Sequence, residues 1–338
     1  MSFGVVAMAG VLGEPVDVTL AAAEYTPDLK KIQGWGYRRF HRAEAGVGLS
    51  DLAVRAGHLA LTRAGLDPGD VDLVVLAMAD IAEYLYWDAA AATQARLGAH
   101  RAEALLLNQA CGSGVMSFDA VAGKFATHDE YRTALIIAAN RVCEAYWNRM
   151  EATTSISSDG AAAAVAVRGH PGCRWLTTAV ISDGRYADFF RLESGGAARP
   201  FGAAGLRPAQ VENPFDRLEV FFGNDLREML RFIEIIGARN REVFEKACHK
   251  AAVPPRSVKR VIHLNDNMKA LADLAKDLGI SVGHTNADLA MDYGHLGCAD
   301  QIFCLERHVG SGDLARGDVV ALTSVGSGMH WACTLLRI

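Results

Sequence analysis

The feature that most constrains this sequence of 338 residues is a weak internal repeat. Residues 63–75 resemble residues 250–262, which sets a shift of 187 residues (250 − 63) between the two copies. The same shift aligns further pairs without a gap, namely Ala134 with Ala321, Cys111 with Cys298, and Asn108 with His295. Since one shift serves three separated segments, we predict a duplicated fold with one copy in each half of the chain.

Each copy contains the same alternation of helices and apolar strands. In the first copy a helix begins near Ser50 or Asp51, either of which can serve as its N-cap. Apolar strands follow at 71–78 and 134–139, and strands covered on both faces have this continuous apolar pattern. The second copy has matching segments at 241–251, 260–264 and 319–324. This alternation predicts an α/β fold of two similar halves, stacked as a five-layer αβαβα sandwich that shares its middle helix layer.

The chain divides into three predicted parts: an N-terminal half at 1–170, a connecting segment at 171–225 and a C-terminal half at 226–338. Between Ile181 and Asn224, glycine and proline recur too often for a simple connection, and long irregular segments of this kind are often functional lids. A loose surface excursion is the alternative. Packing is favoured by the phenylalanines of the segment, which are Phe189, Phe190, Phe201, Phe215, Phe221 and Phe222.

Composition and charge exclude several classes of protein. A net charge of −5 gives no reason to expect nucleic-acid binding. The longest apolar runs, such as 161–167, are far shorter than a membrane span, and residues 1–15 read as a strand. The seven cysteines are odd in number and form no CxxC pair, which argues against a disulfide framework or a zinc site. We therefore expect a protein of the reducing cytoplasm, without metal, nucleic acid or membrane among its partners.

Cys111 is the strongest candidate for a catalytic residue. The segment 108–114 joins a predicted strand at 104–107 to a predicted helix at 115–125, so Cys111 stands at a helix N-terminus. Backbone N–H groups and the helix dipole at such a terminus favour a thiolate, which is the nucleophilic form of cysteine. The neighbouring glycines allow a substrate to approach the backbone closely. The alternative is a buried structural cysteine in a glycine-rich turn.

Two histidines in the second half can serve this cysteine. His263 follows the predicted strand 260–262, and His295 lies five residues before Asp300. Either histidine taken alone would more often be structural. Histidine suits proton transfer near neutral pH, and two histidines at strand ends can converge on Cys111.

Together these segments resemble the β-ketoacyl-acyl-carrier-protein synthase III family of the thiolase superfamily, over nearly the whole chain. The matching pieces occur in the family's order and are Gly36-Tyr37-Arg38-Arg39, Arg96-Leu97-Gly98, the turn at Cys111, Ser158-Asp159-Gly160-Ala161 and Gly326-Ser327-Gly328. The resemblance implies a thiolase fold, a homodimer and a Cys111 nucleophile. It implies no cofactor besides the coenzyme A or acyl carrier protein that carries the acyl donor. It also implies an oxyanion hole from the N–H of Cys111 and a glycine N–H near Ser327.

The aromatic segment 80–87 has a further implied role. In the resembled family the corresponding loop crosses the dimer interface and closes the partner's acyl pocket. This places Tyr86 about where the crossing side chain belongs, with Trp87 beside it in the acyl pocket. The alternative is that these aromatic side chains pack in their own core.

The departures from the family pattern bear on the reaction. The family's His-Gln-Ala-Asn is here His263-Leu264-Asn265-Asp266, and its Tyr-Gly-Asn is here Tyr293-Gly294-His295. A histidine at 295 is similar to elongating ketosynthases. It is also similar to synthase-III-like acyltransferases and starter-unit enzymes of antibiotic clusters, some of which pair it with an aspartate like Asp300. The family's tryptophan at the coenzyme A entrance is absent, and Lys30 or Lys31 stands near that place.

We therefore predict acyl transfer through Cys111 in secondary metabolism, from a carrier thioester to an alcohol or amine acceptor. His263 and His295 would share proton transfer and positioning, with Asp300 orienting His295 as in a catalytic triad. Decarboxylative Claisen condensation with both histidines is the alternative enzyme. A non-catalytic partner subunit of a ketosynthase is a third reading, and the presence of Cys111 and His263 argues against it.

Overall fold

The structure is a computed structural model that describes residues 2–150, 154–192, 195–198, 200 and 220–338. Its main feature is a nine-stranded sheet of order β5-β4-β6-β7-β1-β8-β11-β10-β9. The strands of this sheet are β1 (Phe3–Leu12), β4 (Leu73–Met78), β5 (Glu103–Leu107), β6 (Thr133–Asn140), β7 (Gly160–Arg168), β8 (Arg174–Ser182), β9 (Val258–Ile262), β10 (Val319–Gly326) and β11 (His330–Arg337). A separate two-stranded sheet consists of β2 (Glu14–Asp17) and β3 (Arg39–Arg42).

The described α-helices are α1 (Val18–Tyr25), α2 (Leu29–Trp35), α3 (Leu49–Ala64), α4 (Ala89–Leu97), α5 (Ser113–Thr127), α7 (Leu226–Lys250), α8 (Met268–Leu278), α9 (Ala287–Tyr293) and α10 (Asp300–Ser311). Single turns of 3₁₀ helix are η1 (Pro68–Asp70), η2 (Gly184–Tyr186), η3 (Pro255–Ser257), η4 (Val282–His284) and η5 (Gly297–Ala299). Among the described residues, none of the helices combines the length and apolarity that a membrane span requires.

Four strands in each half of the large sheet have the same topology, and β5 is an additional edge strand of the first half. In the first half, β4 runs parallel to β6, β6 is antiparallel to β7, and β7 is antiparallel to β1. In the second half β9 runs parallel to β10, and the antiparallel order continues through β11 to β8. This confirms the predicted duplicated α/β fold. The two halves meet where Gly4 pairs with Arg174 and Val5 N–H donates to the Cys173 carbonyl at 3.1 Å, so the predicted two sheets join edge to edge.

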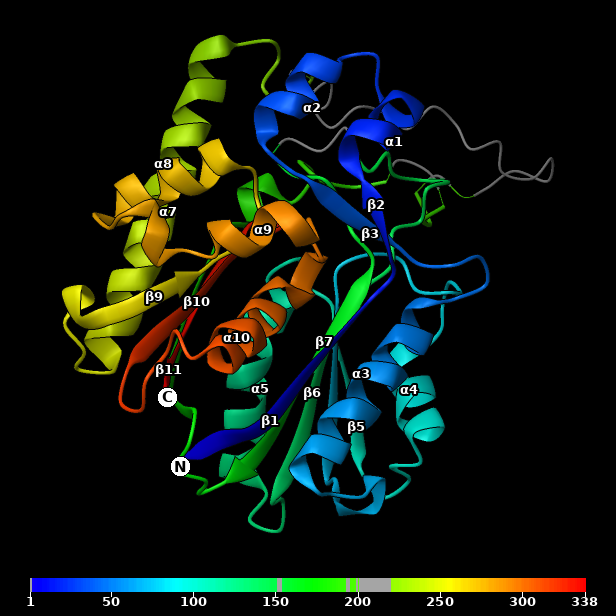
Figure 1. Cartoon of the computed structure of the whole chain (residues 1–338), viewed down its shortest axis with the longest axis vertical. Helices are drawn as coiled ribbons and strands as arrows, with labels where there is room; N and C mark the ends of the chain where they lie inside the picture. Colours follow the sequence, from blue (N-terminus) through cyan, green and yellow to red (C-terminus); the bar gives the residue numbers. More distant parts are fainter. Residues whose placement is uncertain (1, 151–153, 193–194, 199, 201–219) are drawn as a thin grey trace.

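The layers follow from which helices pack on which strands. Helices α3 and α4 cover the outer face of the first half-sheet, and α7 covers that of the second. Helix α5 contacts strands of both half-sheets, and α10 lies beside it in the middle layer (Figure 1). Side chains such as Phe118, Ile302 and Phe303 are fully buried in this middle layer. The arrangement is the expected five-layer αβαβα sandwich of the thiolase fold.

Several element boundaries differ from the sequence prediction. Helix α3 is capped at Gly48, because the carboxylate of Asp51 accepts the Gly48 N–H at 2.7 Å from inside the first turn. Strand β8 lies within the predicted connecting segment, and its pairing with β11 makes it part of the second half-sheet. Helix α7 begins at Leu226, well before the predicted start at 241. The domain boundaries themselves stay predictions.

The described part of the predicted lid packs rather than projecting into solvent. Phe189 lies 5.0 Å from Phe232 of α7 and 6.0 Å from Phe221, measured between ring centres. Phe222 packs against Phe232 as well, at 5.4 Å. These rings join the core that α7 forms over the second half-sheet. Phe201 and Phe215 lie outside the described residues, so the lid role stays a prediction.

Candidate active site

Cys111 occupies a strained turn between β5 and α5. The preceding residue, Ala110, has a φ of 49°, in the left-handed region that an alanine rarely adopts. Gly112 is the N-cap of α5, and its N–H donates to the Gln109 carbonyl at 3.2 Å. The turn leaves Cys111 half-buried directly before the helix N-terminus, as the sequence predicted for a nucleophile.

The structure brings Cys111, His295 and Asp300 into one chain of contacts. Cys111 Sγ lies 3.3 Å from His295 Nε2, and His295 Nδ1 lies 2.5 Å from Asp300 Oδ2. Asp300 is fully buried, and its Oδ1 accepts the Leu296 N–H at 2.7 Å. A thiol, an imidazole and a carboxylate in this order have the geometry of a nucleophile, its base and the group that orients the base.

The charges around His295 favour its protonated form. Burial by itself would lower the pKa of the His295 imidazole, but the neighbouring charges of Asp300 and Cys111 raise it well above the usual value. A proton held by His295 next to the sulfur stabilises a thiolate, because opposite charges attract strongly where solvent is excluded. His295 can therefore supply a proton next to the Cys111 sulfur.

The backbone of His295 is hydrogen-bonded to the buried segment 156–159, which was not connected to the site from the sequence. The His295 N–H donates to the Ile156 carbonyl, and the Ser158 N–H donates to the His295 carbonyl, both at 2.8 Å. The next residue, Asp159, forms a fully buried bidentate ion pair with Arg149, at 2.9 and 3.0 Å. Arg149 was not recognised in the sequence as part of this site, because only the folded chain brings it against Asp159.

His263 lies at the end of β9 in a different environment. Its Nδ1 lies 2.8 Å from the hydroxyl of Thr323, and its side chain is only 4% exposed. Burial lowers the pKa of His263 to about 4, and the nearby charge of His295 acts in the same direction. His263 is therefore neutral at pH 7, where its ring can donate one hydrogen bond and accept another. Among the described residues, no hydrogen bond joins His263 to Cys111, so its catalytic role stays a prediction.

The C-terminal end of β10 lies against the turn that carries Cys111. A Cβ atom on Gly326 would come within 2.4 Å of the Gln109 carbonyl oxygen and 2.9 Å of the Gly112 nitrogen. The Ser324 hydroxyl donates to the carbonyl of Cys111 at 2.8 Å. This close approach explains the glycine at 326. It places Ser327, the predicted oxyanion residue, in the turn that follows Gly326.

Tyr86 and Trp87 lie in the segment between β4 and α4. Tyr86 is fully exposed, with a φ of 53°. Trp87 packs edge-on against Tyr84 at 5.3 Å and joins the core under α3 and α4. The packing of Trp87 agrees with the alternative that these aromatic side chains pack in their own core, and the roles of Tyr86 and Trp87 in a partner's acyl pocket stay predictions.

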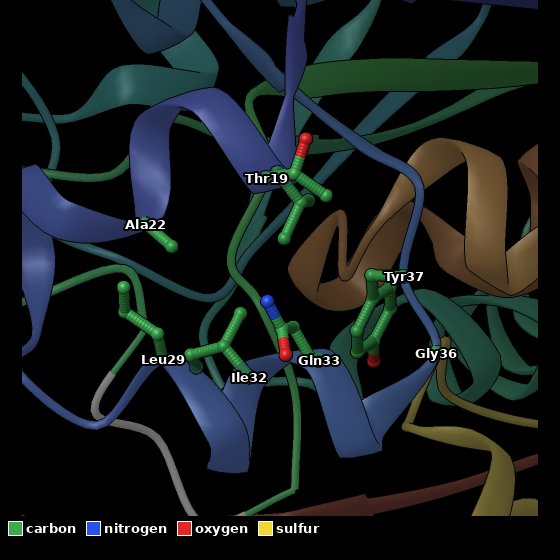
Figure 2. Close-up of a pocket in the computed structure, with 8 residues that line it drawn as sticks. Thr19, Ala22, Leu29, Ile32, Gln33, Gly36 and Tyr37 are labelled. Carbon is green, nitrogen blue, oxygen red and sulfur yellow. The ribbon is translucent and has the colours of Figure 1, made fainter.

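Helices α1 and α2 form the walls of a separate pocket of about 190 Å³ (Figure 2). Its lining consists of Val18, Thr19, Ala22, Leu29, Ile32, Gln33, Gly36 and Tyr37. In α2, Lys31 Nζ lies 5.1 Å from the ring centre of Trp35. Within the described ranges, no group of three or more acidic, histidine or cysteine side chains could hold a metal ion.

Comparison with known proteins gives concordant matches. Residues 248–338 match the family described as the C-terminal part of 3-oxoacyl-[acyl-carrier-protein (ACP)] synthase III. The β-ketoacyl-[acyl-carrier-protein] synthase III of Gloeobacter violaceus is 30% identical over 294 residues, covering 86% of this chain and 84% of the relative. The solved structure of ChlB3, described as an acyltransferase, superposes with a TM-score of 0.87 at 21% identity, covering 100% of this chain and 98% of ChlB3. The 3-oxoacyl-[acyl-carrier-protein] synthase III of Aquifex aeolicus superposes with a TM-score of 0.76 at 22% identity, covering 99% and 100%. At these identities the two structural likenesses concern the fold alone.

Proposed function

Because this chain belongs to the β-ketoacyl-[acyl-carrier-protein] synthase III family, we propose that it takes an acyl group from a thioester onto Cys111 and passes it to an alcohol or amine. The donor thioester is carried by an acyl carrier protein or coenzyme A, as in the family. The single observation that carries the proposal is the contact chain from Cys111 through His295 to the buried Asp300. We place the reaction in secondary metabolism and the enzyme in the cytoplasm.

In the first half-reaction, the Cys111 thiolate attacks the carbonyl carbon of the donor thioester. Hydrogen bonds from the Cys111 N–H and a glycine N–H near Ser327 stabilise the negative charge that develops on the carbonyl oxygen. The bond between the acyl carbon and the carrier sulfur breaks, and the leaving thiolate takes the proton from His295. His295 is left neutral beside an acyl-Cys111 thioester.

In the second half-reaction, the neutral His295 accepts the proton of the acceptor's O–H or N–H as that atom attacks the thioester. The bond between the acyl carbon and Cys111 breaks, which restores the thiolate next to a protonated imidazole. Asp300 keeps His295 in the tautomer that presents Nε2 to the reacting atoms, since its carboxylate binds Nδ1–H. His263 stays neutral and hydrogen-bonds in the site.

Decarboxylative condensation is the second candidate, and the names of the curated relatives favour it. In that reaction both histidines would act as hydrogen-bond donors to an enolate oxygen. A carboxylate behind His295 is not required for such a donor, whereas a general base needs it to stabilise the imidazolium. The description of ChlB3 as an acyltransferase also supports transfer.

Carbon dioxide release separates the two reactions. We expect a neutral acyl thioester to be consumed with transfer to an added alcohol or amine and without carbon dioxide. Release of carbon dioxide from a malonyl donor, equal in amount to the product, would instead assign the enzyme to condensation. Labelling the malonyl carboxylate gives this answer directly, whatever the acceptor.

The active assembly is proposed to be a homodimer. Strand β5 lies at the edge of the large sheet, with side chains that are half-buried along its whole length. Tyr84, Leu85 and Tyr86 expose 68%, 61% and 110% of their surface in the single chain, which a second copy would cover. Sedimentation at micromolar concentration tests this, and a monomer would contradict it. The Tyr86→Asp variant should shift the equilibrium toward monomers.

A further inference from the structure

Asn265 is the residue at which the loops of the two histidines meet. It is fully buried and lies two residues after His263. Its backbone N–H donates to Asp300 Oδ2 at 2.7 Å, the oxygen that also contacts His295. Its side-chain Nδ2 donates to the carbonyl of Gly294 at 2.8 Å, directly before His295 in the chain. Asn265 therefore binds both the carboxylate of Asp300 and the backbone directly before His295.

The remaining hydrogen-bonding atoms of Asn265 are also occupied. Its Oδ1 accepts from Asn286 Nδ2 at 2.7 Å and from the Cys304 thiol at 3.3 Å. Asn286 is fully buried as well and binds both the N–H and the carbonyl of His263, at 2.8 and 3.1 Å. The carbonyl of Asn265 accepts the hydroxyl of Tyr37 at 2.6 Å, and the ring of Tyr37 lines the pocket between α1 and α2 (Figure 2). A buried side chain with this many partners keeps one orientation.

We propose that Asn265 is a positioning residue that fixes Asp300 against His295 and thereby sets how much of Cys111 is thiolate at neutral pH. The inference rests on the proposed function, because it gives Cys111 and His295 their roles from that reaction. Asp300 Oδ2 is shared between the Asn265 N–H and the His295 ring. If the loop of Asn265 shifts, this oxygen moves with it, and His295 holds its proton less firmly.

The other titratable groups around the His295–Asp300 pair, besides Cys111, come from several elements, and the charged Arg149–Asp159 ion pair lies one residue beyond Ser158, which binds the His295 carbonyl. His263 at the end of β9 is neutral, as shown above. Burial raises the pKa of further groups, which are Tyr37 after α2, Cys298 in η5, Cys304 in α10, and Asp266 in the loop after β9. The reactivity of Cys111 between pH 7 and pH 9 therefore reports mainly on its pairing with His295.

The test is the rate of Cys111 alkylation by iodoacetamide in the full chain, expressed as the ratio of the rates at pH 7 and pH 9. At pH 9 a thiol without a neighbouring base is already largely ionised. The ratio of the two rates therefore reports how much His295 increases the reactivity of Cys111 at pH 7. In Asn265→Ala the side-chain contacts to Gly294 and Asn286 are lost. We expect the ratio to fall by about tenfold, the loss typical of a broken buried polar contact.

The matched control is Asn240→Ala, which removes another buried asparagine, in α7 away from the site. It should lower thermal stability and leave the ratio unchanged. Equal changes of the ratio in both variants, or no change in Asn265→Ala, overturn the proposal.

A milder pair of variants decides the question if Asn265→Ala does not fold. Tyr37→Phe removes only the hydroxyl on the Asn265 carbonyl and should lower the ratio about two- to threefold. Tyr131→Phe removes a hydroxyl that binds Glu103 far from the site and should leave the ratio unchanged. An unchanged ratio in Tyr37→Phe then contradicts the proposal. Failure of the proposed function would look different, because the alkylation profile would be as expected while no acyl thioester formed on Cys111.

Discussion

His263 and His295 carry the same imidazole, yet their surroundings give them opposite properties. His295 lies between the Asp300 carboxylate and the Cys111 sulfur, and its pKa is raised well above the usual value. His263 lies against the Thr323 hydroxyl, and burial lowers its pKa to about 4. Burial alone would lower the pKa of both. The difference teaches that the charge of the partner, rather than the depth of burial, decides which histidine can hold a proton.

The largest effect is expected from His295→Asn. Asparagine cannot accept a proton near neutrality, and general-base catalysis contributes about 10²–10⁴-fold. We expect a loss of this size in transfer from a preformed acyl-enzyme, loaded at pH 9 so that Cys111 ionises without help. Rapid-quench measurement of a single turnover gives the rate. His308→Asn, which alters another buried histidine that pairs with an aspartate, should keep the wild-type rate.

Asp300→Asn should cause a smaller loss of the same kind. An amide cannot accept hydrogen bonds on both of its polar atoms, while Asp300 accepts from His295, Asn265 and Leu296. A hydrogen bond to a charged group is worth about 1.5–3 kcal/mol, or about 10–150-fold in rate. The same single-turnover assay checks this, with Asp313→Asn as the control. A rate equal to that of the wild type would show that Asp300 does not contribute to the transfer step.

His263→Asn should have a smaller effect still. The amide can keep a contact with Thr323 and remains a neutral donor, as His263 is at pH 7. Loss of one neutral hydrogen bond costs about 1 kcal/mol, or about fivefold in rate. If the loss in steady-state transfer instead reaches that of His295→Asn, the two histidines share proton transfer and the comparison fails.

The last prediction concerns the free energy of unfolding and its dependence on pH, not a reaction rate. For His263 the folded pKa of about 4 lies below the unfolded value of about 6.5. The unfolded chain therefore binds more protons between these values, and stability falls by up to roughly 3 kcal/mol as the pH drops from 6.5 to 4. His295 has the opposite sign, since its raised pKa contributes stability below pH 6.5 that is lost as the pH rises through the folded value.

Chemical denaturation at several pH values checks these signs. His263→Asn should lower the slope of stability against pH below pH 6.5, and His295→Asn should raise that slope above pH 6.5, where the contribution of His295 is lost in the wild type. A change of the same sign in both variants would show that the two histidines do not differ as described.

Much of the fold could be predicted from the sequence because the repeat and the continuous apolar strands are local signals. Strands β4, β6, β9 and β10 lie within a few residues of their predicted positions. Strands β8 and β11 were missed because neither has a counterpart among the repeat segments that set the prediction. The N-cap of α3 was predicted at Ser50 or Asp51 but is Gly48. Asp51 lies inside the first turn and accepts the Gly48 N–H, and the sequence alone does not show which of these positions begins the helix.

The candidate site was predictable where residues stand in motifs. Cys111, His295 and Asp300 were named from the sequence, and the structure brings them into contact. The residues that hold them were not predictable, because Arg149 and Thr323 reach the site only through tertiary packing. Nor does sequence distinguish the electrostatics of His263 and His295, which depend on neighbours far away in the chain.

The most direct test of the account is the mass of the intact protein after incubation with a neutral acyl thioester, followed by peptide mapping. Wild type should gain one acyl group on the peptide that contains Cys111, and Cys111→Ala should gain none. Cys298→Ala, at the repeat-related position, should gain the same acyl group as wild type, because Cys298 is fully buried with its pKa raised by that burial. An acyl group on the Cys111→Ala protein, or none on the wild type, would contradict the central claim.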